Sequence, residues 1–306
     1  SAVFAVCAII ALWRKDRPKY FGLGTTQKVG VKDYVDTLAH NRAIQMLVVS
    51  ASTDKLFMST MSNSTVMICL FGIIFGNYAA FSSYSQITSI PIALISILLM
   101  NKIARQMGQK SSMMTGTYGG IIGSIIITLF LVFVNPRGDA SKFAIPAFRI
   151  IRPDTWGTLF TGWSAVGLIF ILLVIAWRCV QALSSSIVIP MTADCADYEV
   201  YRTGKYVPGL MGTLFSFVDK LVSSLATTLV ALFYSMVGFK DALPDTLTPY
   251  SDGIFWATIG CFVLLPIVGW LCNVVAMHFY PLTKEKMEEI QAEIGRIKAE
   301  AAAKQA

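Results

Sequence analysis

Six long apolar runs restrict what this sequence can fold into more than any other feature. A membrane-spanning helix needs about 20 predominantly apolar residues, and each run is long enough to supply one. Runs above about 25 residues must tilt, kink or project into water. The runs are Met46 to Gly76, Tyr84 to Ala104, Ser112 to Val134, Phe160 to Pro190, Pro208 to Gly238 and Ile254 to Phe279. The sequence therefore predicts an all-α fold, a polytopic membrane bundle of six helices.

Composition and charge support this fold class. The chain is 55% hydrophobic and 14% charged, with a mean hydropathy of +0.62, which excludes a soluble globular domain and a disordered tail. The net charge of +7 comes from Lys and Arg in short segments between apolar runs, as membrane topology requires. We therefore expect the lipid bilayer, and not nucleic acid, as the surroundings of this chain.

The distribution of Lys and Arg also predicts the orientation of the chain. Most basic residues lie before the first run, between the second and third runs, and after the last run. Such segments stay in the cytoplasm, so we expect a multi-pass cell-membrane protein whose C-terminus is cytoplasmic. The last segment, residues 281–306, has Met287, Ile290, Ile294 and Ile297 at helical spacing after a possible cap at Thr283. It is predicted to be an amphipathic helix that is solvated or lies on a surface.

The segments before the first run have their own predictions. Ala2 to Trp13 is apolar but too short to span, and it lacks the basic start and cleavage pattern of a signal peptide. We interpret residues 1–13 as the tail of a truncated transmembrane helix, residues 14–42 as a central cytoplasmic loop and residues 43–280 as the six-helix bundle. The chain is accordingly expected to be the C-terminal half of a longer protein.

The sequence gives little support for an enzyme or a metal site. The cysteines occur singly, without a CxxC pair, and both histidines lie near predicted membrane surfaces. No Gly-rich phosphate loop and no nucleophile with a histidine partner can be identified. We predict no catalysis, no cofactor and no bound metal.

Lys220 is the most unusual residue in the apolar runs. A charge at mid-membrane costs about 2.5 kcal/mol or more, so its default interpretation is functional. It lies about 18 Å along its helix from Pro208 at about 1.5 Å per residue, and is predicted to be buried there. Thr213, Ser216 and Ser223 share its helical face. These four side chains are predicted to face water or a ligand.

Asp54 and Lys55 lie at a similar predicted depth in the first run. We expect at least one acid and one base among Asp54, Lys55, Asp219 and Lys220 to pair across the first and fifth helices. A ligand hydroxyl or carboxylate could then displace one partner. The alternative is a static ion pair that only fixes the packing.

Arg178 is a further candidate for binding. It lies about 18 residues into the fourth run, and its planar guanidinium could hold an anionic group. If this helix extends into the cytoplasm, Arg178 instead lies near the membrane interface.

The third run contains two overlapping small-residue spacings, Gly116 with Gly120 and Gly119 with Gly123. Such spacings let a neighbouring helix approach closely. We predict a packing role for them.

The segment between the fourth and fifth runs is the most specific signature. Its residues are Pro190, Met191, Ala193, Asp194, Asp197, Tyr198, Tyr201, Thr203, Gly204 and Lys205, followed by Gly209 and Lys220. They resemble the junction between the tenth and eleventh helices of the glycoside, pentoside and hexuronide cation symporters, the melibiose permease-like family of the major facilitator superfamily. The resemblance implies that this chain is the C-terminal six-helix half of such a fold.

The resemblance also implies a mechanism. In this family two six-helix bundles alternate around a midplane site, and entry of Na+ or H+ drives the uptake of a sugar. Lys220 would lie near the sugar pocket, and the coupling ion would be bound mainly by an N-terminal bundle that this chain lacks. A gating hinge would comprise Asp194, Asp197, Tyr198, Arg202 and Lys205.

Two other functions stay open at this point. A lysolipid or lipid-like carrier of a related branch would use a lysine to grip an anionic headgroup in a cleft open to the bilayer. A membrane scaffold or sensor that does not transport would tolerate the loss of Lys220.

Overall fold

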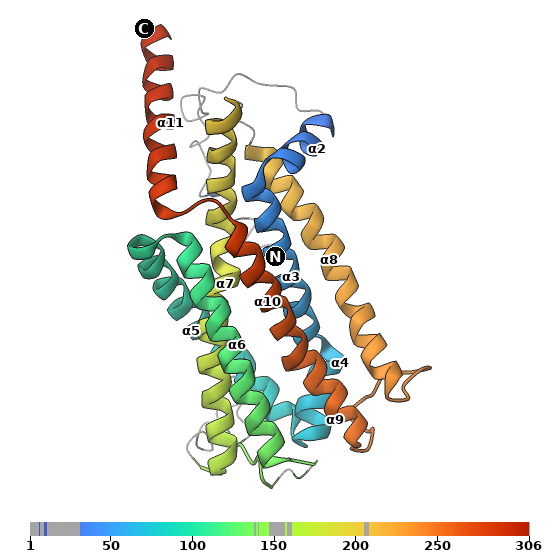
Figure 1. Cartoon of the computed structure of the whole chain (residues 1–306). Helices are drawn as coiled ribbons and strands as arrows, with labels where there is room; N and C mark the ends of the chain where they lie inside the picture. Colours follow the sequence, from blue (N-terminus) through green and yellow to red (C-terminus); the bar gives the residue numbers. More distant parts are fainter. Residues whose placement is uncertain are drawn as a thin grey trace.

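The computed structural model describes residues 6, 9–10, 31–137, 139, 141–146, 157, 161–204 and 208–305. Its helices run alternately up and down along the long axis of the molecule (Figure 1). The principal elements are α2 (Val31–His40), α3 (Arg42–Met61), α4 (Ser64–Met67), the π-helix η2 (Ile68–Ile74), α5 (Tyr78–Met107), α6 (Gln109–Val134), α7 (Ala165–Thr203), α8 (Pro208–Met236), α9 (Asp252–Ile259), the π-helix η4 (Gly260–Leu264), α10 (Leu265–Phe279) and α11 (Lys284–Gln305). Most of residues 1–30 lie outside the described part, and with them most of the predicted helix tail and central loop.

Five of these helices are long and apolar enough to cross a membrane, and the bent pair of α3 with α4 and η2 is a sixth candidate span. The six spans correspond to the six runs predicted from the sequence. Between residues 31 and 305 the chain is therefore a multi-pass helical membrane protein.

The first span differs from the continuous helix that we predicted over Met46 to Gly76. The chain bends by 47° between α3 and the helix that begins at Ser64. Asn63 lies at the bend and accepts a hydrogen bond from the backbone N–H of Thr65, so it caps the second piece. This cap, together with the π-helical turn that follows it, explains the break.

The fourth span is the largest correction to the predicted fold. Helix α7 begins at Ala165 and runs for 39 residues, through Pro190, to Thr203. Asp194, Asp197, Tyr198 and Arg202 therefore lie on its last turns and not in a separate hinge. The helix ends where Gly204 adopts a φ of 71°, a conformation that glycine accepts without steric cost. Its length, about 58 Å at 1.5 Å per residue, exceeds the hydrocarbon thickness.

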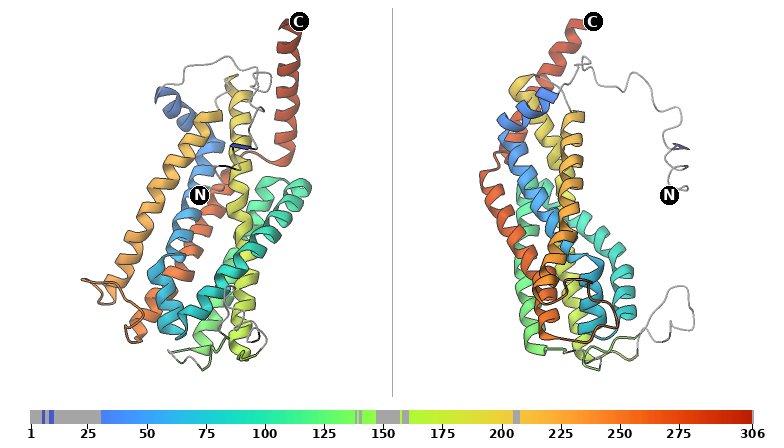
Figure 2. Two further views of the ribbon diagram at one scale, coloured as in Figure 1. Left: turned by 180° about the vertical axis from the view of Figure 1, so that it is seen from behind. Right: turned by 90° about the vertical axis from the view of Figure 1, so that its right-hand side faces the viewer.

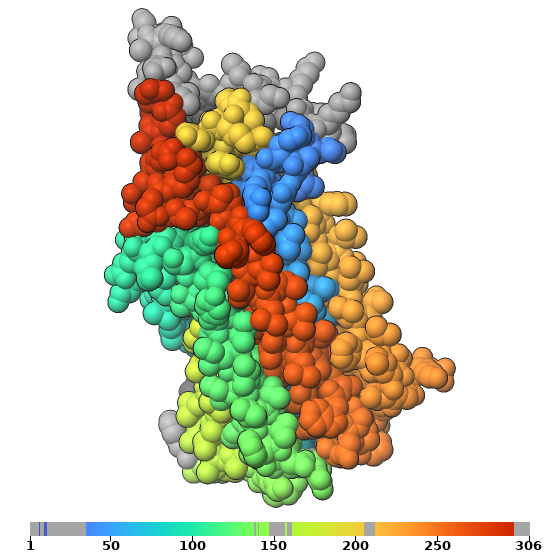
Figure 3. All heavy atoms as spheres, viewed as in Figure 1, coloured from blue at the N-terminus to red at the C-terminus, as the bar shows by residue number. Residues whose placement is uncertain are grey.

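Helix α3 packs mainly against α10 and α8, and helix α7 packs mainly against α6 and α5. Helix α10 crosses one face diagonally, with α6 on one side and α3 and α8 on the other (Figure 3). On the opposite face α8, α3 and α7 come to the front (left view of Figure 2). Helices α2 and α11 lie at the same end of the bundle, which we call the α11 end.

An aromatic cluster fills the core at the end opposite α11. The Phe75 ring lies 4.4 Å from Phe143, 4.7 Å from Phe170 and 4.8 Å from Phe81, measured between centroids. All four side chains are almost fully buried. The cluster joins the end of the first span to α5, α7 and the loop after α6, and each aromatic pair adds about 0.5–1.5 kcal/mol beyond simple burial.

The two small-residue spacings of α6 have the packing role predicted for them. A Cβ on Gly116 would meet the backbone of Ser184 in α7, and one on Gly123 would meet the ring of Trp177. The Trp177 indole also donates a 3.0 Å hydrogen bond to the carbonyl of Gly120. Because these glycines lack side chains, α7 lies directly against the backbone of α6.

Helix α11 differs from the solvated or surface-lying helix that we predicted. It stands away from the bundle beside the last turns of α7 (Figures 1 and 2). Ile290 and Ile294 are buried against those turns, and Thr283 caps the helix as expected, accepting a hydrogen bond from the Lys286 N–H. On the exposed side the Lys286 ammonium donates to Glu289 and holds the pKa of that carboxyl below its usual range.

The contact between α6 and α7 can be tested at Gly123. We expect Gly123→Ala to lower stability by about 1–3 kcal/mol, because the new methyl group overlaps the Trp177 ring. Gly212→Ala in α8 is the matched control, since a Cβ at Gly212 has nothing within 4 Å and the change should be neutral or stabilising. Thermal unfolding of both purified variants in detergent measures the difference. Equal melting temperatures would contradict this packing.

Candidate functional site

A cavity of about 560 Å³ lies between α3, α7 and α8, roughly halfway along the bundle. Its volume is within the range of about 300–1,000 Å³ that is usual for small-molecule sites. The lining combines charged, hydroxyl and apolar side chains: Ala51, Ser52, Asp54, Lys55, Met58, Ser185, Val188, Ile189, Phe215, Ser216, Val218, Asp219 and Lys220.

An ion pair crosses this cavity. Lys55 Nζ of α3 lies 3.2 Å from Asp219 Oδ1 of α8, and the two side chains are 48% and 42% exposed. The structure confirms the predicted pairing of an acid and a base across the first and fifth helices. At this exposure the pair is worth at most about 1 kcal/mol, so a competing partner can separate it at little cost.

Lys220 lines the same cavity but is exposed, which corrects the prediction that it is buried. The sequence indicates the depth of Lys220 along α8, but it does not show whether a neighbouring helix covers the side chain. Ser216, one turn earlier, also lines the cavity. The two other members of the predicted hydroxyl face, Thr213 and Ser223, lie outside the lining.

Asp54 lies at the base of the cavity and is only 4% exposed. Its Oδ1 accepts a 3.0 Å hydrogen bond from the Trp270 indole, which reaches it from α10. Ser184 of α7 is a second polar neighbour. Within the described part of the chain, no Lys, Arg or His nitrogen lies within 4.0 Å of this carboxylate. Asp54 is thus a buried acid whose partners are neutral.

A polar network continues behind Asp54, towards α6. Ser50 donates to the amide oxygen of Asn273 at 2.5 Å, and the amide nitrogen of Asn273 donates to the Thr117 hydroxyl at 2.7 Å. All three residues are fully buried. The network ties α3, α10 and α6 together beneath the cavity.

Trp270 and Asn273 were not among the residues predicted to form the site. Both lie in a strongly apolar run, Ile254 to Phe279, whose pattern indicates only a spanning helix. The single polar atom of Trp270 and the lone amide of Asn273 carry the contacts. Intramembrane Asn is a usable sequence signal, because a buried amide must find partners.

Arg178 does not reach the cavity. Its guanidinium donates a 2.9 Å hydrogen bond to the Ser85 hydroxyl, so it joins α7 to α5. The structure therefore separates it from the four charged residues around the cavity. Its predicted role as a clamp for an anion at that site is not supported by its position.

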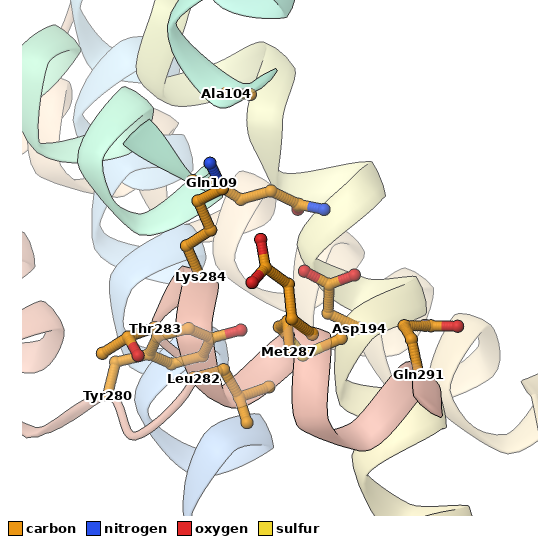
Figure 4. Close-up of a pocket in the computed structure, with 11 residues that line it drawn as sticks. Ala104, Gln109, Asp194, Tyr280, Leu282, Thr283, Lys284, Met287 and Gln291 are labelled. Carbon is orange, nitrogen blue, oxygen red and sulfur yellow. The ribbon is translucent and has the colours of Figure 1, made fainter. Parts of the chain in front are cut away.

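The residues predicted to form a gating hinge gather at the α11 end. Asp194 faces a smaller cavity of about 260 Å³ between α7 and the start of α11, shown with Gln109, Tyr280 and Met287 in Figure 4. Asp197 accepts a 2.5 Å hydrogen bond from Gln291 of α11. Lys205 lies outside the described residues.

Arg202 belongs to a separate cluster with a buried acid. Its guanidinium lies 2.9 Å from Glu199, which is 3% exposed. Glu199 also accepts a 2.8 Å hydrogen bond from Asn41, the cap of α3. This cluster fixes the end of α7 against the start of α3.

A metal site is not evident in the described ranges. Nowhere between residues 31 and 305, apart from the undescribed gaps, do three or more His, Cys, Asp or Glu side chains come close enough to hold an ion.

Comparison with known families identifies the class of protein. Residues 1–284 match the sequence profile of the family described as MFS/sugar transport protein, where MFS denotes the major facilitator superfamily. The chain belongs to this family. Membership of the MFS/sugar transport family agrees with the apolar helical spans.

Within the MFS/sugar transport family, the chain is similar to the glucuronide carrier protein homolog of Escherichia coli (strain K12). The two are 26% identical over 117 residues, which is 37% of this chain and 24% of the relative. The matched stretch thus covers about a quarter of the relative's length.

The contact between Trp270 and Asp54 predicts a measurable stability effect. Trp270→Phe removes the indole N–H but keeps most of the ring volume. We expect a loss of about 1–3 kcal/mol in mildly alkaline buffer, because a buried carboxylate loses its donor. Trp256→Phe is the control, since Trp256 is 54% exposed. Thermal unfolding in detergent compares them, and a Trp270→Phe protein as stable as the control would contradict the importance of this hydrogen bond.

Proposed function

We propose that this protein is a secondary active transporter that moves a sugar (a glycoside, pentoside or hexuronide) together with Na+ or H+ by alternating access. The observation that carries the proposal is the cavity between α3, α7 and α8, with its ion pair, its unburied Lys220 and its hydroxyl groups. Charged side chains at this depth of a membrane bundle mark a solute or ion pathway. Membership of the MFS/sugar transport family supports the same function.

The chemistry of the lining suits a sugar. Ser52, Ser185 and Ser216 offer hydroxyl groups for hydrogen bonds with sugar hydroxyls, while Phe215 provides an aromatic face for the apolar side of a pyranose ring. Met58, Val188 and Val218 add apolar side chains to the lining. This mixture favours a small polyhydroxylated solute over a purely apolar one.

Among sugars, we propose a hexuronide as the substrate. Lys55 and Lys220 both line the cavity, and Lys55 is held by a weak, half-exposed ion pair with Asp219. The carboxylate of a sugar acid can replace Asp219 as the partner of Lys55 and pair with Lys220 as well. The similarity to a glucuronide carrier homolog supports this choice.

We propose that the cavity face meets an N-terminal six-helix bundle. Ile189 is 79% exposed and Phe217 of α8 is 66% exposed, beside charged residues that require water or protein and not acyl chains. A second bundle on this face would enclose the site. The α11 end, which carries the excess of Lys and Arg, would then face the cytoplasm of a cell membrane.

The role of Lys220 separates transport from a scaffold or sensor. We expect Lys220→Ala to reduce uptake of methyl β-D-glucuronide into proteoliposomes at least tenfold, because the anionic solute loses one of its two cationic partners. Lys240→Ala, in the exposed loop after α8, should leave uptake unchanged. No uptake by the wild type would favour a scaffold or sensor, and normal uptake by Lys220→Ala would contradict the proposed role of this lysine. Competition by lysophosphatidylglycerol, and not by the glucuronide, would instead favour a lysolipid carrier.

A further inference from the structure

We propose that Asp54 is a proton-binding site whose protonation and the binding of an anionic sugar to the cavity favour each other. This inference deepens the proposed function and rests on it for the identity of the sugar. It places one coupling site within the helices of this chain, on α3, under the ion pair of Lys55 and Asp219.

The surroundings of Asp54 are suited to a carboxyl group that changes its protonation state. Only 4% of the Asp54 surface is exposed, so the charge of its carboxylate is largely removed from water. The donor from α10 is the neutral Trp270 indole, and α7 contributes Ser184, whose hydroxyl also donates to the Gln181 carbonyl. Neutral donors stabilise a carboxylate less than a cation does, so neither protonation state is locked.

The charged groups facing Asp54 come from two elements. On α3 the neighbouring Lys55 points to Asp219, and on α8 Asp219 and Lys220 line the same cavity. From α7 the polar neighbour of Asp54 is the neutral Ser184, whereas Arg178 of that helix turns to Ser85 of α5. From α10 it is the neutral Trp270. The net charge of the site is therefore set by four residues: Asp54, Lys55, Asp219 and Lys220.

These four residues explain why the proton and an anion bind together. Lys55 and Lys220 carry two positive charges, and Asp54 and Asp219 carry two negative charges when ionised. A sugar carboxylate entering this neutral site would leave an excess negative charge beside Asp54, a carboxylate that is already largely removed from water, which is costly. Protonation of Asp54 removes that excess. A proton and one sugar acid then enter as a neutral pair.

The residues around Asp54 favour a proton over a sodium ion. Na+ is a hard cation that requires several oxygen ligands, whereas one oxygen of Asp54 is already occupied by an N–H donor. Met58 supplies a thioether to the cavity wall, a soft ligand that suits Na+ poorly. A proton needs only one carboxylate oxygen. During the cycle it would form an O–H bond with Asp54 from water on one side and leave to water on the other.

Linkage gives the sign of the pH dependence. Because the anion binds better when Asp54 is protonated, its affinity should fall by about tenfold per pH unit once Asp54 ionises, and binding at such a pH should take up a proton. In Asp54→Asn residue 54 is always uncharged, so the site keeps the net charge of +1 that protonation of Asp54 gives to the wild type. Its affinity for the anion should therefore stay near the wild-type value at low pH and no longer depend on pH.

The experiment measures binding of methyl β-D-glucuronide to the full-length purified protein by calorimetry across a range of pH, in buffers of different ionisation enthalpy to count protons. Wild type is expected to take up about one proton per sugar at alkaline pH, and Asp54→Asn none. Asp241→Asn, in the exposed loop after α8, is the control and should behave as wild type. Methyl β-D-glucoside, which has no carboxylate, should bind without proton uptake. Proton uptake that persists in Asp54→Asn overturns the proposal.

A second measurement keeps this test separate from the identity of the sugar. Infrared difference spectra between acid and alkaline pH, recorded without sugar, should show a protonated carboxyl band that Asp54→Asn removes and Asp54→Glu restores at a shifted position. If wild type binds no glucuronide, the proposed substrate is wrong, while this band still decides the proton site. If no band between about pH 5 and pH 9 depends on Asp54, the proton site is wrong whatever the protein transports.

Discussion

The hydrogen bond from the Trp270 indole to Asp54 is the contact on which the middle of this bundle depends. It joins α10 to α3 at the base of the cavity. The Trp270 ring also lies against Gly120 of α6 and meets the Trp177 ring edge-on, with centroids 6.3 Å apart. A bulkier residue at Gly120 or a shorter side chain at Trp270 would therefore disturb three helices and the carboxylate together.

The ion pair of Lys55 and Asp219 in the cavity differs from this contact in its exposure to water. Asp54 is buried and satisfied by neutral donors, whereas Lys55 and Asp219, one residue further along α3 and across on α8, are half exposed and paired with each other. The same pair of helices thus holds one acid away from water and leaves an ion pair open to it. Such a difference in environment is how two carboxylates of one site acquire different roles.

At the α11 end, the last turns of α7 are held by contacts with α11. Helix α7 is longer than a membrane requires, so its last turns need partners outside the bilayer. Ile290 and Ile294 of α11 cover one side of these turns, and the hydrogen bond from Gln291 to Asp197 closes the contact. Asp194 and Asp197, which the sequence places in a hinge, thus lie on the continuous helix α7, and α11 packs against that part of it.

The sequence by itself determined the helical class, the number and places of the apolar spans, the packing role of the α6 glycines and the depth shared by Asp54, Lys55 and Lys220. These follow from the length and spacing of apolar and small residues, which act within one helix. Tertiary structure alone decided the bend at Asn63, the continuity of α7 through Pro190, the exposure of Lys220 and the pairing of Asp54 with Trp270. The physical reason is that each of these depends on which neighbour lies against a helix face, and a periodic apolar pattern does not specify the neighbour.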